Sequence, residues 1–572
     1  MSENDAVANR LDEIADLLEA MDVDFKPRAY RRAADHIREL DRPVEQIATE
    51  GQDALEEIEG VGEAIAEKII EYLETGSIEE LEDLRESLPV EMSALTRVEG
   101  IGPKRVGMLY EALGIRTLDE LAAAAEAGEI QTVPGFGEKS EQNILDHIPF
   151  ARQAAKRHLL YVARSLADEI LDEFAAIDAV DRCEVAGSIR RWLPTIGDVD
   201  ILIATDVGGS LTTTIESLAF AAETIEAGDR KASYRTDEGI RVDFRFIEPS
   251  VFGAALQYFT GSKHHNVQVR QRAIDRGLKV NEYGVFTGTD ERIAGETEES
   301  VYEVVDLPWM APEIREGRGE IEAADAGALP TLLESSDMRG DLHVHSDWSD
   351  GSMSIAEMVD AADTLGLEYL AITDHATGPG VVAGTGVEDA ELLRQREEID
   401  HANQSTEVTV LHGVEANIDA EGGISVSDAV LEELDIVIAS PHAALTQDRE
   451  QATERLLHAI SHPQVDVIGH PTGRKLGQRP GLPIDIERVA KAAASQHVAL
   501  EVNSHPVRLD LEGEAVKTVI EHGGTIAIST DAHVGHELEL IRYGVHTARR
   551  GWAEPSNVLT AWTVEEVRSF ID

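Results

Sequence analysis

The sequence is poor in cysteine and in long apolar runs. Its 572 residues include one cysteine, Cys183, which excludes an intramolecular disulfide and a thiolate metal cluster. No apolar run reaches the roughly 20 residues of a membrane helix, and the acidic, amphipathic N-terminus has no cleavable apolar core. We therefore expect a cytoplasmic protein with no membrane partner, in which Cys183 is a small structural residue.

Positive charge is also scarce. The chain has 110 Asp and Glu against 50 Lys and Arg, of which 11 are Lys, and its formal net charge is −60. This charge would repel nucleic acid at low salt, but at molar salt the Debye length falls to about 3 Å and the repulsion is screened. The acids are dispersed along the chain, which favours solvation in a halophilic, salt-rich cytoplasm over the alternative, recognition of a basic partner.

The pattern of apolar residues changes along the chain. A length of 572 residues predicts several structural units. Residues 1 to 150 have helical periodicity, strands appear from 150 to 310, and seven short apolar runs alternate with helical segments after residue 340. The last pattern predicts a parallel sheet closed as a (β/α)7 barrel-like domain, with polar residues at the strand ends where such barrels form active sites. We expect a multidomain chain: a helical N-terminal region, an α+β centre and this barrel.

Three N-terminal segments repeat one theme, Gly-x-Gly before an amphipathic helix. They are "IEGVGEAIAEKI", "VEGIGPKRVGML" and "VPGFGEKSEQNIL", and they resemble helix-hairpin-helix modules. The glycines allow a tight turn and leave the N–H groups of the next helix free for a phosphate, whatever the base sequence. For the third segment, plain helix packing is an equal alternative. The candidate DNA-phosphate residues are Gly60, Gly62, Gly100, Gly102, Lys104, Gly135 and Gly137.

A cluster of carboxylates is expected in the α+β centre. In "GSIRRWLPTIGDVD", Asp198 and Asp200 lie two apart on a strand and share a face, and Asp243 in "IRVDFRF" can join them from a neighbouring strand. Three carboxylates in a core need divalent cations to neutralise them. Two Mg²⁺ ions, or Mn²⁺ in their place, would clamp the attacking and leaving oxygens of a phosphoryl displacement. The alternative for any one Asp is a strand-end turn.

Histidine is concentrated in the barrel, with 15 of 20 after residue 340. The apolar runs end in side chains that can bind metals, and these exceed what one ion can use, which implies two or three Mn²⁺, Zn²⁺ or Fe²⁺ ions. Arg474, Asn503 and His505 follow strand ends and are candidates for substrate phosphate or for loop roles. The expected ligands are His343, His345, Asp350, His375, Glu415, His442, His470, Asp531 and His533.

Further motifs in the centre are "YFTGS" (258–262), "HHNVQVR" (264–270) and "NEYGVF" (281–286). Together with the Gly-Ser turn and the Asp motifs, they resemble a family X, DNA polymerase beta-like, polymerase. The resemblance implies that Asp198, Asp200 and Asp243 are catalytic. Asp198 and Asp200 would hold both metals, and Asp243 would hold the catalytic metal and help the primer 3′-hydroxyl to lose its proton. It also implies a nucleotide site made by Gly187, Ser188, Arg191, Gly197, Arg241, Tyr258, Phe259, Gly261, Asn266 and Arg270.

The N-terminal segment "FKPRAYRRAA" (25–34), with the first glycine repeat, resembles the small lyase domain of the same family. The resemblance places Lys68 as the lysine that attacks an abasic sugar, with Lys26 and Tyr30 near its 5′-phosphate. Ala64 stands where the beta-like members often carry another lysine, so we expect 5′-phosphate binding more than lyase chemistry. The alternative for Lys68 is a solvated surface lysine.

The barrel motifs "DLHVHSDWSDG", "ITDH", "GVEANI", "SPH", "GHP" and "STDAH" resemble the PHP domain, named for polymerase and histidinol phosphatase. All nine expected ligand positions are occupied, which implies a working phosphoesterase. The whole resembles the bacterial and archaeal family X polymerases with a PHP tail, of haloarchaeal type. The expected segments are a lyase-like domain at 1–90, fingers at 91–150, a nucleotidyltransferase palm at 151–250, a thumb-like subdomain at 251–315, a linker at 316–338 and the PHP domain at 339–572.

The expected function is therefore filling of short gaps in DNA repair, with a metal-dependent 3′→5′ exonuclease or phosphoesterase in the tail. The expected partners are gapped or nicked DNA and deoxynucleoside triphosphates, and the chain is expected to be a monomer. Two alternatives stay open: a phosphatase for a small phosphomonoester such as histidinol phosphate, and a non-catalytic scaffold for DNA ends. The first leaves the N-terminal 310 residues unexplained, and the intact acidic trio argues against the second.

Overall fold

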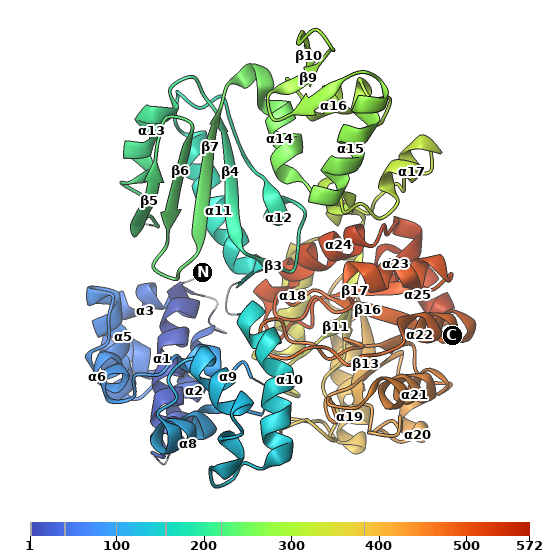
Figure 1. Cartoon of the computed structure of the whole chain (residues 1–572). Helices are drawn as coiled ribbons and strands as arrows, with labels where there is room; N and C mark the ends of the chain where they lie inside the picture. Colours follow the sequence, from blue (N-terminus) through green and yellow to red (C-terminus); the bar gives the residue numbers. More distant parts are fainter. Residues whose placement is uncertain are drawn as a thin grey trace. The chain divides into compact units, whose positions relative to one another are not determined.

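The computed structural model describes residues 3–571 apart from 24, 39, 41, 99, 155, 156, 219 and 383. The chain divides into two compact units (Figure 1): Met1–Arg157 with Leu476–Pro480, and His158–Lys475 with Gly481–Asp572. Within the described residues, no helix combines the length and the apolar character that crossing a membrane requires.

The first unit is helical in its described part, as predicted. In the first helix, α1 (Glu3–Ala20), Val7, Leu11, Ile14 and Leu18 recur at helical spacing, and all are buried in one core that extends through the unit. The other helices are α2 (Lys26–Arg38), α3 (Val44–Glu50), α4 (Gln52–Glu56), α5 (Glu63–Thr75), α6 (Glu79–Ser87), α7 (Met92–Leu95), α8 (Pro103–Leu113), α9 (Leu118–Glu126) and α10 (Glu138–Ala154).

Each glycine repeat forms a turn that leads into a helix. The first glycines, Gly60, Gly100 and Gly135, have φ angles of 80°, 83° and 88°, the left-handed region that glycine tolerates best. The second glycines of the first two repeats, Gly62 and Gly102, are extended and serve as N-caps of α5 and α8. The N–H groups at these helix starts are therefore not covered by a capping side chain.

The second unit begins with a five-stranded sheet in the order β2-β4-β7-β6-β5 (Figure 1). Its centre is the parallel pair β4 and β7, and its other neighbours pair antiparallel. The strands are β2 (Arg182–Val185), β4 (Asp198–Ala204), β5 (Glu223–Ala227), β6 (Lys231–Arg235) and β7 (Arg241–Ile247). The short pair β1 (His158–Leu159) and β3 (Thr195–Ile196), with helices α11 (Leu160–Ala175), α12 (Gly187–Arg190) and α13 (Gly208–Ile215), completes this palm. Helix α14 (Phe252–Thr260) packs against it through Phe252, Ala255 and Leu256.

A small subdomain follows the palm. It contains α15 (Lys263–Asp275), the three-stranded sheet β8 (Lys279–Asn281), β9 (Gly284–Phe286) and β10 (Arg292–Ala294), then α16 (Glu298–Glu303) and α17 (Glu320–Asp325). Helix α17 lies inside the segment expected as a linker. Its Ile321 and Ala324 join the apolar core of the subdomain, and Glu320 contacts the buried His265 at 2.8 Å. Helix α17 packs onto the subdomain because it has an apolar face, whereas Leu333, later in the segment, joins the core of the barrel.

The C-terminal part forms the predicted (β/α)7 barrel. Seven parallel strands run in chain order, and a bridge between Val344 and Ala532 brings the first strand next to the last. The strands are β11 (Gly340–Val344), β12 (Tyr369–Ile372), β13 (Thr409–Asn417), β14 (Ile436–Ser440), β15 (Val467–Ile468), β16 (Ala499–Asn503) and β17 (Ile526–Ser529). The helices are α18 (Ile355–Thr364), α19 (Asp389–Ala402), α20 (Asp428–Leu431), α21 (Arg449–Ile460), α22 (Ile486–Gln496), α23 (Gly513–Glu521), α24 (Ile541–Arg550) and α25 (Val564–Ile571).

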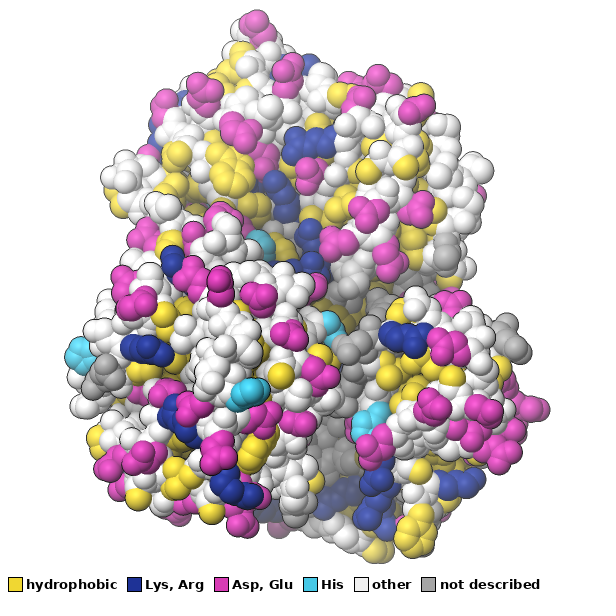
Figure 2. Space-filling view, turned by 180° about the vertical axis from the view of Figure 1, so that it is seen from behind, with side chains coloured by type: hydrophobic (Ala, Val, Ile, Leu, Met, Phe, Trp, Pro, Cys, Tyr) yellow, Lys and Arg dark blue, Asp and Glu magenta, His cyan; other side chains and the backbone are white. Residues whose placement is uncertain are grey.

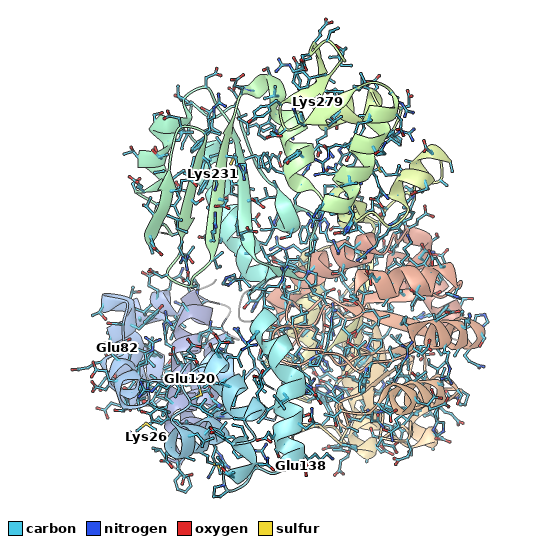
Figure 3. All side chains as sticks on the ribbon, viewed as in Figure 1. Lys26, Glu82, Glu120, Glu138, Lys231 and Lys279 are labelled. Carbon is cyan, nitrogen blue, oxygen red and sulfur yellow. The ribbon has the colours of Figure 1, made fainter. Side chains whose placement is uncertain are left out.

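The acidic side chains lie mainly on the surface. Figure 2 shows Asp and Glu dispersed over the visible face, with Lys and Arg between them. In Figure 3, Glu82, Glu120 and Glu138 extend from helices of the first unit, and all three are exposed. This dispersion is what the sequence predicts for a solvated acidic surface.

Candidate functional site

The three palm carboxylates come from the two central strands. In the parallel pair of β4 and β7, Asp200 is the direct partner of Asp243, and Asp198 precedes Asp200 by two residues on the same face. Gly187, at the start of α12, lies against this group: a Cβ added there would be 2.1 Å from an oxygen of Asp200. The sequence brings the carboxylates together through strand register, and only glycine fits beside them.

The charges of this palm cluster are close enough to interact. Burial raises the pKa of Asp200 to about 7, and the negative charges of Asp198 and Asp243 add to the shift. Arg241 donates to Asp243 at 2.9 Å, and Ser233 of β6 donates to the same carboxylate. The cluster therefore has excess negative charge, which divalent cations would relieve.

The other predicted nucleotide residues make different contacts in the structure. Arg191 donates to the carbonyl of Thr260, next to Gly261, whose φ of 73° lets the chain turn there. Asn266 is nearly buried, and its side-chain amide is already bonded to Gln257 and to the carbonyl of Tyr258. Its predicted contact with a base would therefore require these bonds to be exchanged.

The remaining predicted residues differ mainly in exposure. The rings of Tyr258 and Phe259 meet edge to face at 5.1 Å. Arg270 and Gly197 are exposed, and Ser188 is half-buried in α12.

A buried charge network that the sequence did not reveal ties α12 to the thumb-like subdomain. Arg190 forms two hydrogen bonds of 2.8 Å with Glu298, and the fully buried Arg315 donates to Glu298 at 2.6 Å. Burial alone would raise the pKa of Glu298, but Arg315 and Arg190 lower it well below its usual range. Trp309 donates to the same carboxylate at 3.1 Å.

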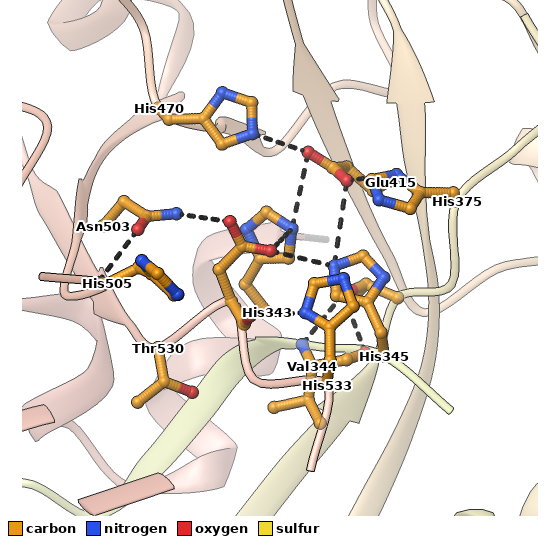
Figure 4. Close-up of polar contacts among 12 residues, drawn as sticks. His343, Val344, His345, His375, Glu415, His470, Asn503, His505, Thr530 and His533 are labelled. Carbon is orange, nitrogen blue, oxygen red and sulfur yellow. Dashed lines mark hydrogen bonds and ion pairs between the residues drawn. The ribbon is translucent and has the colours of Figure 1, made fainter. Parts of the chain in front are cut away.

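In the barrel, the nine predicted metal-binding side chains gather at the carboxyl ends of the strands. Figure 4 shows His343, His345, His375, Glu415, His470 and His533 among them. Three sets have ligand atoms within 4.8 Å of one another. Asp531 contacts His345 at 3.1 Å, and His470 contacts Glu415 at 2.9 Å, so the residues outside these sets also touch the cluster. The sets are His345, Asp350, His375 and His533; His343, His345 and Glu415; and His375, Glu415 and His442.

Glu415 lies at the centre of this barrel cluster. Its carboxylate oxygens are 2.6 Å from Nδ1 of His375, 3.2 Å from Nε2 of His442 and 3.4 Å from Nε2 of His343. Burial would raise the pKa of Glu415, but His442, His375 and His343 lower it well below its usual range. One carboxylate that contacts several imidazoles is suited to bridge two cations.

The imidazoles of the barrel cluster differ in pKa. Burial, and then His533 and His375, lower the pKa of His345 to about 3, while burial followed by Arg508 lowers that of His470 to about 3. The pKa of His533 rises to about 10, because its bond to Asp350 and the charge of Asp531 outweigh burial. Neutral imidazole is the metal-binding form, so a cation in this cluster would displace protons.

Residues outside the predicted set orient the ligands. Glu501 of β16 is buried and accepts a bond of 2.7 Å from Nδ1 of His343, and the side-chain oxygen of Asn417 lies 2.6 Å from Nδ1 of His442. Such partners fix which ring nitrogen faces the metal. Strand position alone could not distinguish them from ordinary polar residues.

The barrel cluster fits divalent cations on its own geometry. Nε2 of His343, Nε2 of His442 and one oxygen of Glu415 are buried and lie at ion-pair distance from other ligands of the cluster, but they form no well-aligned hydrogen bond among the described residues. Buried polar atoms without a partner are costly, and a metal would satisfy them. Imidazole with carboxylate suits Mn²⁺, Zn²⁺ or Fe²⁺.

Of the three residues considered for substrate phosphate, Asn503 donates to Asp531 at 3.0 Å and its own oxygen accepts from the N–H of His505. Arg474 is directed away from the cluster, since it bonds the carbonyl of Arg508 and the carboxylate of Glu512 at 2.8 and 2.9 Å. Arg508 instead lies 3.3 Å from Asp531, and sequence reasoning missed it.

In the first unit, Lys26, Tyr30 and Lys68 converge as expected, but on a carboxylate. Glu80 of α6 lies 2.9 Å from Nζ of Lys68, accepts a bond of 2.9 Å from the Tyr30 hydroxyl and lies 3.8 Å from Lys26. Burial would raise the pKa of Glu80, but Lys68 and Tyr30 lower it. Glu80 therefore occupies the position where the sequence predicted a phosphate.

The predicted phosphate residue Lys104 also has an acidic neighbour. Its Nζ is 2.6 Å from Asp22, and both side chains are exposed. Because such surface pairs are weak, a phosphate can replace Asp22 at little cost.

Comparison with known proteins extends these observations to nearly the whole chain. Residues 2–78 match the helix-hairpin-helix domain, 92–148 the SAM-like helix-hairpin-helix tandem, 255–316 the DNA polymerase beta thumb and 341–505 the PHP domain. The chain is 37% identical over 555 residues to the DNA polymerase/3′-5′ exonuclease PolX of Bacillus subtilis, which covers 96% of this chain and 95% of the relative.

Two further relatives match different parts of the chain. DNA polymerase lambda of Rattus norvegicus is 25% identical over 339 residues, 54% of this chain and 56% of that protein. A probable phosphatase of Caldanaerobacter subterraneus subsp. tengcongensis is 36% identical over 205 residues, 34% of this chain and 76% of that protein. Because the PolX match spans both chains almost end to end, the chain belongs to the family X DNA polymerases that carry a C-terminal PHP domain.

Proposed function

We propose that the chain is a DNA-directed DNA polymerase that fills short gaps, with a 3′→5′ exonuclease in its PHP domain. The observation that carries the proposal is the presence of two separate clusters of possible metal ligands in one chain. One is the carboxylate trio on β4 and β7, made by Asp198, Asp200 and Asp243. The other is the imidazole-rich cluster around Glu415 in the barrel. Each cluster has the charge and the donor set for divalent cations, and Glu415 lies within the part of the chain that matches the PHP domain.

In the palm, Asp198 and Asp200 would hold both Mg²⁺ ions and Asp243 the catalytic one. Such ions stabilise the attacking and leaving oxygens of an in-line displacement when bound. Asp243, oriented by Arg241 and Ser233, is placed to accept the proton of the primer 3′-hydroxyl. Ser188 and Arg191 would hold the triphosphate, with Gly187 and Gly197 close to it, and Tyr258, Phe259 and Gly261 would line the sugar pocket.

In the barrel, the nine clustered side chains would hold two or three Mn²⁺, Zn²⁺ or Fe²⁺ ions, which supply activated water for attack on phosphorus. Arg508, 3.3 Å from Asp531, is the cation best placed to bind the substrate phosphate beside them. The relative from Bacillus subtilis is named a 3′-5′ exonuclease, which supports a nucleic-acid substrate for this site over a small phosphomonoester.

The helical unit would bind the DNA backbone. The turns at Gly60, Gly100 and Gly135 present helix N–H groups that hold phosphates without reading sequence, and Lys104 adds one charge. At the lyase-like site, Glu80 competes with a 5′-phosphate for Lys68, Lys26 and Tyr30. This competition supports weak 5′-phosphate binding more than lyase chemistry.

A direct test uses a one-nucleotide gapped duplex in molar KCl, with Mg²⁺ for extension and Mn²⁺ for degradation. We expect templated addition of one nucleotide when the triphosphate is present, and stepwise loss of 3′ nucleotides when it is absent. Hydrolysis of histidinol phosphate without any action on DNA would favour the small-molecule phosphatase instead. Binding of the gapped duplex without either reaction would favour the scaffold.

A further inference from the structure

The last long helix of the barrel, α24, contacts the palm loop that carries the proposed triphosphate residue. Arg550 of α24 donates a hydrogen bond of 2.5 Å to the backbone carbonyl of Arg191. One helical turn earlier, the ring of His546 stacks on Trp192 with 3.6 Å between centroids and 6° between planes. Both contacts lie within the second unit, so the PHP domain reaches the polymerase's phosphate-binding loop directly.

The loop adopts a conformation that depends on its neighbours. Trp192 has a φ of 54°, a left-handed value that costs energy for a bulky side chain. Its ring is held between His546 on one helix and Arg164 of α11, whose guanidinium lies 5.1 Å from the ring centroid. Because the strained residue directly follows Arg191, contacts that fix Trp192 also fix the direction of the Arg191 side chain.

A single carboxylate joins the two arginines. Glu316 accepts from Nε of Arg191 at 3.1 Å and from Nη1 of Arg550 at 3.0 Å. The side chain of Arg191 is 12% exposed, that of Arg550 10% and that of Glu316 14%, so water screens their charges little. When Arg191 turns to a triphosphate, Glu316 would lose one cation, and a poorly solvated carboxylate without a partner is strongly unfavourable.

We propose that Arg550 of the PHP domain is a positioning residue for polymerisation: it neutralises Glu316 and thereby releases Arg191 for the incoming triphosphate. The inference rests on the proposed role of Arg191 in the palm. Without Arg550, Glu316 would retain Arg191, and nucleotide binding would weaken. The chemical step would change little, because the metal-binding carboxylates are not touched.

The test measures KM and kcat for the nucleotide in single-gap filling by the full chain, with melting temperature and exonuclease rate recorded for each variant. We expect Arg550→Ala to raise KM about tenfold, with kcat and the exonuclease rate within threefold of the wild type. The double variant Arg550→Ala with Glu316→Gln should return KM to within threefold, since the competing charge is gone. Arg488→Ala, which breaks pairs with Glu450 and Glu454 on the barrel surface, is the matched control and should change nothing.

Two outcomes would overturn the inference: an unchanged KM in Arg550→Ala, or a raised KM that Glu316→Gln does not relieve, which is the mark of a structural role only. If Arg550→Ala does not fold, Arg550→Lys replaces it, because lysine cannot hold Glu316 and the Arg191 carbonyl in the same geometry. We expect an intermediate KM for this variant, and a wild-type KM would contradict the inference. Arg191→Ala distinguishes the two failures. An unchanged KM in this variant means that the proposed role of Arg191 itself fails, whereas a raised KM here with an unchanged KM in Arg550→Ala means that only the coupling fails.

Discussion

Asp200 of β4 and Asp243 of β7 are direct partners in a parallel strand pair, with Gly187 pressed against the Asp200 carboxylate. Burial of Asp200, and then the negative charges of Asp198 and Asp243 beside it, raise its pKa, which shows that the charged form is unfavourable there. Because protons and cations compete for these carboxylates, we expect the affinity of the palm for cations to depend on pH.

The affinity of the palm for Mg²⁺ should rise with pH. The pKa of Asp200 is about 7, so its proton competes with the metal below neutral pH. We expect the affinity, measured by titration of the His343→Ala variant with Mg²⁺, to increase about tenfold from pH 6 to pH 8. The variant weakens the barrel's own metal signal. When Asp200→Asn is added to the His343→Ala variant, this increase in Mg²⁺ affinity should disappear. An equal increase with and without Asp200→Asn would rule out Asp200 as the titrating group.

The metal-free protein should show the opposite trend in stability. An aspartate whose folded pKa is raised contributes stability that is present below its unfolded pKa, near 3.8, and is lost as the pH rises through 7. In EDTA, the melting temperature of Asp200→Asn should therefore exceed that of the wild type by more at pH 7.5 than at pH 5. A constant difference between the two proteins would contradict the assignment.

Loss of Glu298 should destabilise the junction between palm and thumb-like subdomain. Glu298→Ala leaves the buried Arg315 and the half-buried Arg190 without their carboxylate, and breaking a buried pair in this way costs about 3–5 kcal/mol. Trp309, which bonds Glu298, provides a fluorescence signal for denaturant unfolding. The exposed Glu299→Ala on the same helix is the control, with an expected change within about 0.5 kcal/mol.

Removing the charge of Glu80 should strengthen binding of a 5′-phosphate. One unit charge at about 4 Å is worth at least roughly 1 kcal/mol, so Glu80→Gln should favour 5′-phosphorylated over 5′-hydroxyl gaps about fivefold more than the wild type does. Fluorescence anisotropy with the two DNAs measures this preference. Glu82→Gln, an exposed change on the same helix, should not alter it. If the two variants behave alike, Lys68 does not meet the phosphate.

Arg508 should serve the exonuclease and not the polymerase. Arg508→Ala is expected to raise the KM for DNA degradation about tenfold, the loss of one charge-assisted phosphate contact, and to leave gap filling within threefold. Arg396→Ala, which breaks an exposed pair with Asp435, is the matched control. Equal effects on both reactions would show that Arg508 supports DNA binding in general.

The parts of this structure that follow local patterns were predictable from sequence. Each of the seven barrel strands coincides, to within two residues at its start, with one of the seven apolar runs expected in this part of the chain, because each run is buried and ends in polar residues. The palm pair β4 and β7 follows from apolar segments interrupted by charged residues at alternate positions. In contrast, β5 is exposed at every residue, so it carries no apolar signal that a sequence could reveal.

The contacts that sequence reasoning missed join residues far apart in the chain. Glu298 meets Arg190 across 108 positions, and Glu501 meets His343 across 158. The contact of Glu80 with Lys68 was missed for a similar reason. Helix α6 carries several acidic residues, and the sequence does not indicate which of them pairs with Lys68. In a chain with 110 acids, composition conceals the few that are paired.

The central claim is that two separate cation sites in one chain perform two reactions. The most direct measurement compares Asp198→Ala and His343→Ala on the same one-nucleotide gapped duplex in molar KCl, with folding checked by melting temperature. We predict that Asp198→Ala abolishes extension and retains degradation, and that His343→Ala retains extension and abolishes degradation. Loss of both reactions in either folded variant would contradict the claim.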